Sequence, residues 1–181
     1  MNGSPQSSGK LVWQEFLLPD EIADWAKSRK QPRKLWRTGG VSQAGVYRFI
    51  FPEAGDQYSC YIGVADHLGR RLHEHICPGI NREFIADSGW SVRGAIQNSL
   101  GKCYLQRLSI KGSIDICCAK LNQTSFDDLF ARILLENWAI LYSERRENLR
   151  PRNRDIRMGL SQGAKDLRRK AKAASKKAGY A

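Results

Sequence analysis

The sequence predicts an α/β (α+β) fold in which a small three-stranded antiparallel sheet is flanked by helices, in the order β-β-α-α-β-α. Two short runs of aromatic and β-branched residues are separated by a turn, apolar residues recur every four positions after them, and a long apolar segment with acids at its start follows. The chain has 181 residues, 41% of them hydrophobic, which suffices for one domain with extensions.

The region before the predicted sheet contains two kinds of segment. Residues 1–10 are polar and rich in Gly and Ser, so we expect no fixed structure there. Residues 11–26 contain Trp13 and other large apolar side chains, and Pro19 followed by two acids predicts a helix start. The remainder of residues 11–44 includes the basic stretch SRKQPRKLWR at residues 28–37. Two interpretations of it stay open, a solvated loop with an anchoring tryptophan or a nucleic-acid contact through basic and aromatic side chains. The residues concerned are Lys30, Arg33, Lys34, Trp36 and Arg37.

A β-hairpin is predicted between residues 45 and 64. GVYRFIF (residues 45–51) has the composition of a strand, PEAGD (residues 52–56) is a turn, and QYSCYIGV (residues 57–64) is the returning strand. Tyr47 and Tyr61 can be neighbours across this antiparallel ladder. A single tyrosine on a strand is normally a packing residue, so neither residue alone indicates a site.

Three helices and a third strand are predicted after the hairpin. Asp66 can cap a helix with apolar residues at positions 68, 72 and 76, and a second helix covers residues 91–100. Residues 103–121 contain strand material, clearest in SIDICCAKL. The last helix begins near residues 124–125, has two acids in its first turn and runs to about Arg145.

The charge balance favours a polyanionic partner. Thirty Lys and Arg stand against 18 Asp and Glu, which gives a net charge of +12. Nucleic acid is the usual partner of so basic a chain. Residues 156–181 form a basic C-terminal tail, where phosphate contacts or solubility alone could explain the charge. Its candidate contacts are Arg168, Arg169 and Lys170.

The five cysteines do not predict a zinc site or a disulfide framework. They are odd in number and no pair has CxxC spacing, which favours free thiols in a reducing compartment. No apolar run reaches the length of a membrane span, and residues 1–10 lack the apolar core of a signal peptide. We therefore expect a cytoplasmic protein without membrane partners, nucleoid-associated if bacterial.

Three residues on two predicted helices could carry chemistry. Arg71 borders the apolar stripe of its helix, and His75 follows one turn later on the same face, where they could clamp a phosphate and move a proton. Taken alone, they are better explained as an ordinary basic face. Glu136 lies within the apolar stripe of the last helix, where a carboxylate is costly unless it is paired or bound to a cation. It could form a salt bridge or bind Mg²⁺.

The two tyrosine motifs and these three residues resemble the GIY-YIG nuclease superfamily. GVY (residues 45–47) precedes YIG (residues 61–63), Arg71 and His75 follow Tyr61 by ten and fourteen residues, and Glu136 lies on a later helix. The resemblance covers residues 45–153, so we divide the chain into a nuclease-like domain at residues 45–155 with extensions on both sides. It implies a GIY-YIG-like fold and a metal-dependent endonuclease, a hydrolase that binds DNA and cuts its phosphodiester bonds by one in-line attack of water. RNA stays open as a second substrate, and a homodimer as the assembly.

The resemblance also implies residue roles. Glu136 would bind one Mg²⁺ or Mn²⁺, Arg71 would stabilise charge on the phosphoryl oxygens, and Tyr47 would take a proton from the attacking water. Tyr61 and His75 would position water or phosphate. Val64 departs from the family, which often has a basic residue after YIG, and either Asn148 or Asn153 could be the family asparagine. The alternative function is a catalytically silent nucleic-acid-binding module on the same fold.

Overall fold

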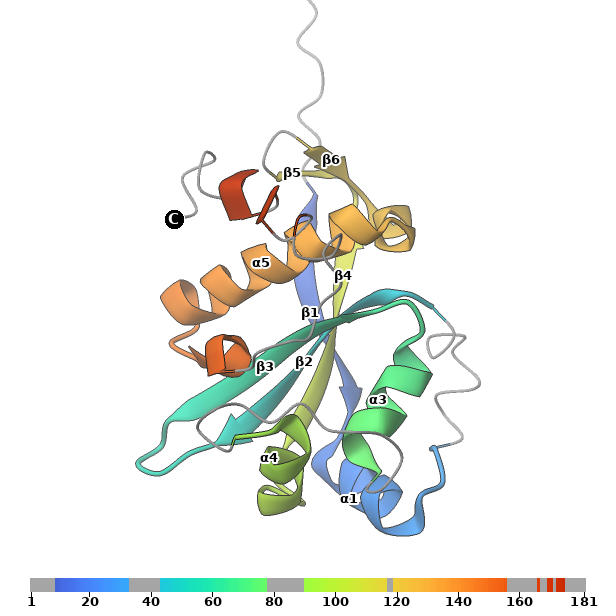
Figure 1. Ribbon diagram of the computed structural model, residues 1–181, viewed down its shortest axis with the longest axis vertical. Helices are drawn as coiled ribbons and strands as arrows, with labels where there is room; N and C mark the ends of the chain where they lie inside the picture. Colours follow the sequence, from blue (N-terminus) through green and yellow to red (C-terminus); the bar gives the residue numbers. More distant parts are fainter. Residues whose placement is uncertain are drawn as a thin grey trace, which may run out of the picture.

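The computed structural model describes residues 9–32, 43–77, 90–116, 119–155, 166, 169–170 and 172–174. Its main sheet has five strands in the order β1-β4-β2-β3-β7, and β3 and β7 are its parallel pair (Figure 1). The strands are β1 (Lys10–Leu17), β2 (Gly45–Pro52), β3 (Tyr58–Ala65), β4 (Tyr104–Lys111) and β7 (Arg150–Pro151). A separate two-stranded sheet is formed by β5 (Ile114–Ile116) and β6 (Ala119–Leu121).

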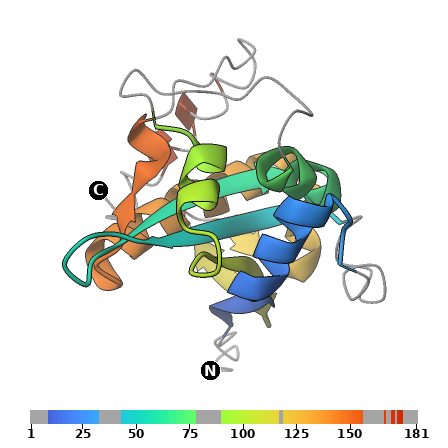
Figure 2. The same ribbon diagram turned by 90° about the horizontal axis from the view of Figure 1, so that it is seen from below.

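Helices cover both faces of the main sheet (Figures 1 and 2). On one face, α1 (Pro19–Ser28), α3 (Leu68–Ile76) and α4 (Val92–Asn98) enclose one apolar cluster. On the other face, α5 (Leu129–Arg146) packs over a second cluster together with β5, β6 and the 3₁₀ turn η1 (Gln123–Asp127). A short 3₁₀ turn, η2 (Arg152–Asp155), follows β7. We call these two sides the α3 face and the α5 face.

The predicted mixture of helices and a sheet is confirmed, but the prediction of three strands was wrong. β1, which we had placed in an extension, pairs with β4 along most of its length. The third strand was expected most clearly in SIDICCAKL, whereas the strand next to β2 is β4, and the SIDICCAKL region contributes the small β5–β6 pair. Polar residues such as Gln106 interrupt β4, and the polar positions of β1 do not alternate, so neither strand has a clear period of two.

The predicted hairpin and helix starts are largely confirmed. β2 and β3 pair from Gly45 opposite Ala65 to Pro52 opposite Tyr58. The helix start at Pro19 is also as predicted. The last helix starts later than predicted, at Leu129, because η1 precedes it and Asp128 caps it by accepting the Ala131 amide hydrogen at 2.7 Å.

The predicted cap of α3 was wrong by one residue. His67 is the N-cap, and its Nδ1 accepts the backbone N–H of Arg70 at 3.2 Å. The carboxylate of Asp66 instead accepts a hydrogen bond from the guanidinium of Arg132 on α5. Asp66 therefore joins the end of the hairpin to the last helix.

The cysteines of the described segments are free thiols. Cys60, Cys77 and Cys103 are buried and free, and burial raises the pKa of Cys60 and Cys103 to about 12. Cys117 and Cys118 lie outside the described residues. In the described part of the chain, no helix is both long enough and apolar enough to span a membrane.

Candidate active site

The two tyrosine motifs meet because the ring of Tyr47 lies across Gly63. These residues are opposite each other in the β2–β3 ladder, and a Cβ atom on Gly63 would lie 2.6 Å from the Tyr47 hydroxyl oxygen. Tyr61 is opposite Phe49 and is therefore a diagonal neighbour of Tyr47, with 6.3 Å between the ring centroids. The glycine of YIG thus leaves the space that the tyrosine of GVY fills.

Helix α3 brings His75 to the two phenols. The Tyr47 hydroxyl and His75 Nε2 are 2.9 Å apart, and the imidazole lies edge-on to Tyr61 with centroids 5.6 Å apart. Burial lowers the pKa of His75 well below its usual value, and the charges of Arg71 and Arg93 lower it further. His75 is consequently neutral at neutral pH, and with its proton on Nδ1 it accepts the phenolic hydrogen at Nε2.

Arg71 supplies the positive charge next to the phenols. Burial raises the pKa of both Tyr47 and Tyr61, whereas Arg71 lowers both through its charge and hydrogen bonding. Its Nη1 also donates to Oε2 of Glu74 at 2.9 Å, one turn later on α3. The guanidinium is therefore fixed on its own helix while it remains partly accessible.

Glu136 on α5 influences the same phenols through its charge. Its side chain is 2% exposed, as its place in the apolar stripe predicted. Its negative charge raises the pKa of both Tyr47 and Tyr61, so the carboxylate lies within electrostatic range of both phenols. Residues from β2, β3 and α3 thus lie together at the positions that the sequence singled out, and Glu136 of α5 acts on them through its charge.

The two candidate asparagines occupy different environments. Asn148 is exposed and has a left-handed backbone (φ 53°) just after α5, which is typical of a residue that ends a helix. Asn153 accepts the N–H of Ile62 through Oδ1 at 2.9 Å and donates to the Ile62 carbonyl through Nδ2. Its side chain thereby continues the pairing of β3 beyond β7, beside Tyr61. Asn153 is the better placed of the two to position the site.

Two residues of this cluster were not predicted. Glu74 holds Arg71, and the spacing of three residues on one helix could have indicated this pair. Arg93 on α4 donates to the Glu74 carbonyl oxygen at 2.7 Å and its charge lowers the pKa of His75. No local pattern connects α4 with α3, so the sequence carries no comparable signal for Arg93.

Val64, the departure from the family pattern, faces away from the phenols. It is opposite Val46 in the ladder and packs with the cluster on the α5 face. Side chains alternate between the faces of a strand, so a long side chain at this position would start from the face opposite Tyr61. The cationic groups of the candidate site come from helices instead.

The donor set suits a cation held by one protein ligand. Within the described segments, no group of three or more His, Cys, Asp or Glu could hold a metal ion. A single buried carboxylate such as Glu136 is a hard oxygen donor, and Mg²⁺ is commonly bound by one or two carboxylates with water and phosphate oxygens completing the shell. The residues present therefore fit a single Mg²⁺ or Mn²⁺.

The predicted nucleic-acid contacts are described in part. Lys30 is exposed just after α1, and Arg169 and Lys170 are exposed in the described part of the tail. The other predicted contacts lie outside the described residues, namely Arg33, Lys34, Trp36, Arg37 and Arg168. Comparisons with models of protein families, with curated protein sequences and with solved structures found no match to this chain.

Proposed function

We propose that this protein is a metal-dependent endonuclease with a GIY-YIG-like site, which hydrolyses phosphodiester bonds of DNA by one in-line attack of water. The observation that carries the proposal is the cluster of Tyr47, His75 and Arg71, with the Tyr47 hydroxyl 2.9 Å from a neutral His75 and Glu136 in electrostatic range. Strongly perturbed protonation within one cluster is typical of functional sites.

The hydrogen bond between Tyr47 and His75 suggests how the water would lose its proton. Burial keeps Tyr47 protonated at neutral pH, so a free phenolate is not available as a base. The phenol oxygen can take the proton of water while its own proton passes to Nε2 of His75. This relay avoids a buried phenolate. His75 holds the proton only briefly, because its lowered pKa favours releasing it again.

The negative charge of the phosphate would be balanced by Arg71 and by a cation that Glu136 holds. The partly exposed guanidinium of Arg71 would stabilise the phosphoryl oxygens in the transition state. Glu136 would hold one Mg²⁺ or Mn²⁺, and the bound cation would supply positive charge at the scissile phosphate. Tyr61 would position the water. Asn153 would hold the end of β3 in place through its two hydrogen bonds to the Ile62 backbone.

The second candidate function is a nucleic-acid-binding module without catalysis. The net charge of +12 and the exposed cations of the tail favour binding in either case. A buried carboxylate adds nothing to the affinity for a polyanion, because it repels phosphate unless a cation intervenes. Glu136 therefore favours the enzyme over the module.

Plasmid nicking tests the proposal. Supercoiled DNA is incubated with Mg²⁺ and the wild type, Arg71→Ala or Glu136→Gln, and we expect each variant to lose about 10²–10³-fold in rate. The matched controls are Arg70→Ala, an exposed arginine on the same helix, and Glu144→Gln, an exposed glutamate on α5. Both controls are expected to nick like the wild type.

Binding is measured in parallel by anisotropy in a chelator. Tight binding of varied DNA substrates by the wild type without any nicking in Mg²⁺ or Mn²⁺ would identify the module. Nicking that survives in both Arg71→Ala and Glu136→Gln would place the catalytic site elsewhere.

A further inference from the structure

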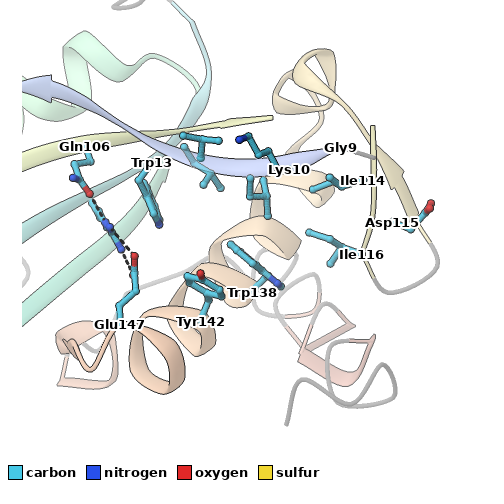
Figure 3. Close-up of a pocket in the computed structure, with 14 residues that line it drawn as sticks. Gly9, Lys10, Trp13, Gln106, Ile114, Asp115, Ile116, Trp138, Tyr142 and Glu147 are labelled. Atoms are coloured by element: carbon cyan, nitrogen blue, oxygen red, sulfur yellow. Dashed lines mark hydrogen bonds and ion pairs between the residues drawn. The ribbon is translucent and has the colours of Figure 1, made fainter. Parts of the chain in front are cut away.

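A cleft of about 680 Å³ lies on the α5 face, opposite the side that carries the phenols. It opens between β1 and α5, with β5 at one end (Figure 3). Trp13 comes from β1, whereas Trp138 and Tyr142 come from consecutive turns of α5. The cleft therefore has aromatic side chains on both sides.

A network of hydrogen bonds around Arg48 fixes one wall of the cleft. The Arg48 side chain is 5% exposed, its Nε donates to Oε1 of Gln106 at 2.7 Å, and both terminal nitrogens donate to Glu147. Its guanidinium carbon lies 4.2 Å from the ring centroid of Trp13. The indole of Trp13 is thus held in place by a cation whose own charge is compensated.

The aromatic side chains offer a flat ligand both stacking surfaces and a hydrogen-bond donor. Trp138 and Tyr142 stack on each other with centroids 4.8 Å apart and planes 21° apart, and Tyr142 is 39% exposed. The indole nitrogen of Trp13 is buried and has no hydrogen-bond partner among the described residues. Figure 3 shows this nitrogen turned toward α5. A buried donor without a partner favours a ligand that supplies an acceptor.

Exposed cations lie near a cleft whose lining also includes the acidic residues Asp115 and Glu147. Lys10 lines it, and the described tail residues Arg169, Lys170 and Lys172 are exposed. Ala174 of the same tail packs against the apolar cluster that also receives Trp138. In Figure 1 the tail lies beside α5 and the β5–β6 pair. Phosphates of a strand entering the cleft would therefore meet positive charge.

We propose that this cleft binds an unpaired nucleobase of a nucleic-acid strand. The base would stack on Trp138 and Tyr142, since every base has a π-face and such stacking tolerates any sequence. The Trp13 N–H would donate to a base acceptor, and the accessible carboxylate of Glu147 would accept from an exocyclic amino group. The backbone would run toward Lys10 and the tail.

An unpaired base fits the lining better than two simpler ligands do. A purely apolar ligand would leave the Trp13 donor unmatched. A simple anion would gain nothing from the two aromatic walls. A base within a duplex is stacked on both sides and cannot enter, which restricts the ligand to single-stranded or extruded bases.

The cleft is tested by comparing two strands of equal charge. Fluorescein-labelled oligodeoxyadenylate and an abasic strand of the same length are titrated by anisotropy in a chelator, so that no bond is cut. We expect the wild type to bind the base-containing strand about tenfold more tightly, the loss typical of one base–aromatic stack. Trp138→Ala and Tyr142→Ala should each bind the two strands with nearly equal affinity, whereas Trp138→Phe should keep most of the preference.

The matched control is Tyr58→Ala, which removes a tyrosine that is 46% exposed and lies outside the cleft. It should keep the full preference. Circular dichroism and thermal melting establish that each variant is folded. Equal affinity of the wild type for both strands, or an unchanged preference in both Trp138→Ala and Tyr142→Ala, would overturn the proposal.

This inference goes beyond the proposed endonuclease activity and does not depend on it. Glu136→Gln should lose nicking and keep the preference for the base-containing strand. A wild type that prefers that strand but nicks no DNA would refute the proposed function and leave the cleft intact. Nicking by a wild type that shows no preference for the base-containing strand would refute the cleft proposal and support the endonuclease.

Discussion

Tyr47 and Arg48 are consecutive residues of β2 and face opposite sides of the sheet. Tyr47 enters the α3 face, where burial raises its pKa and its hydroxyl meets His75. Arg48 enters the α5 face, where Gln106, Ser143 and Glu147 accept hydrogen bonds from all three of its nitrogens. Two adjacent residues of β2 therefore belong to different networks. Tyr47 belongs to one in which pKa values are shifted, and Arg48 to one in which its charge is paired with Glu147.

The difference teaches what a buried polar cluster indicates. A buried ion pair whose donors are all satisfied holds elements together and needs no substrate to explain it. Neutral groups with displaced pKa values next to a partly exposed cation are arranged for proton transfer or charge stabilisation. The α3 face is accordingly the better candidate for chemistry, and the α5 face for binding and stability.

The largest expected effect is the difference in the free energy of unfolding between variants of Arg48 and Arg71. Arg48→Met should lower the free energy of unfolding by about 3 kcal/mol, because Glu147 keeps its charge in a partly buried place without its partner. Arg71→Met should cost less, about 1 kcal/mol, since the Arg71 side chain is 27% exposed whereas that of Arg48 is 5% exposed, and Glu74 keeps an ion pair with Arg70. Denaturant unfolding measures both.

The double variant Arg48→Met with Glu147→Gln should recover part of the loss, because no charge is then left without a partner. If Arg71→Met were as destabilising as Arg48→Met, the distinction between a structural face and a chemical face would fail.

A smaller effect is expected from the glycine under the Tyr47 ring. Gly63→Ala should destabilise the protein by about 2 kcal/mol and lower nicking, since the new Cβ would lie 2.6 Å from the Tyr47 hydroxyl oxygen and would displace the ring. The control is Gly45→Ala, whose Cβ would lie 3.1 Å from a terminal methyl group of Leu68. Unfolding and plasmid nicking are measured for both. Equal effects of the two substitutions would mean that the Tyr47 ring adapts freely.

The parts of the fold that the sequence predicted are those encoded locally. The β2–β3 hairpin, α1, α3, α4 and α5 have turn residues, capping residues or apolar periods within a short window. β1 and β7 are strands because of partners far along the chain, such as Ser109 opposite Val12. Non-local pairing leaves little trace in one sequence when polar residues interrupt the strand.

The same distinction applies to the candidate site. Fixed spacings between Tyr61, Arg71 and His75 identified most of its residues, because they lie on one hairpin and the helix that follows. Arg48 had no such signal, since an arginine on a strand is usually exposed and its acceptor Glu147 is 99 residues away. Arg93 and the aromatic cleft were missed for the same reason. Their meaning depends on which elements pack together.

The smallest expected effect is a change in the pH dependence of stability through His75. Its pKa is lowered in the folded protein by burial, Arg71 and Arg93, so it stays neutral below the pKa of about 6.5 that it has when unfolded. As the pH falls through that value, the unfolded chain takes up a proton that the folded protein resists, and stability decreases. Above it, both states are neutral and His75 makes no contribution to the slope.

His75→Gln keeps an acceptor for the Tyr47 hydroxyl and removes the titrating group. We therefore expect the loss of stability between about pH 7 and pH 5 to be smaller in this variant than in the wild type. Denaturant unfolding at several pH values measures this slope. His67→Gln is the control, because His67 lies at the start of the same helix and its side chain only caps the backbone N–H of Arg70. An identical acid sensitivity of His75→Gln and the wild type would mean that His75 is protonated as readily in the folded protein as in the unfolded chain. In that case the pKa of His75 would not be lowered by its burial, and the pH dependence would not mark it as a group that resists protonation in the folded protein.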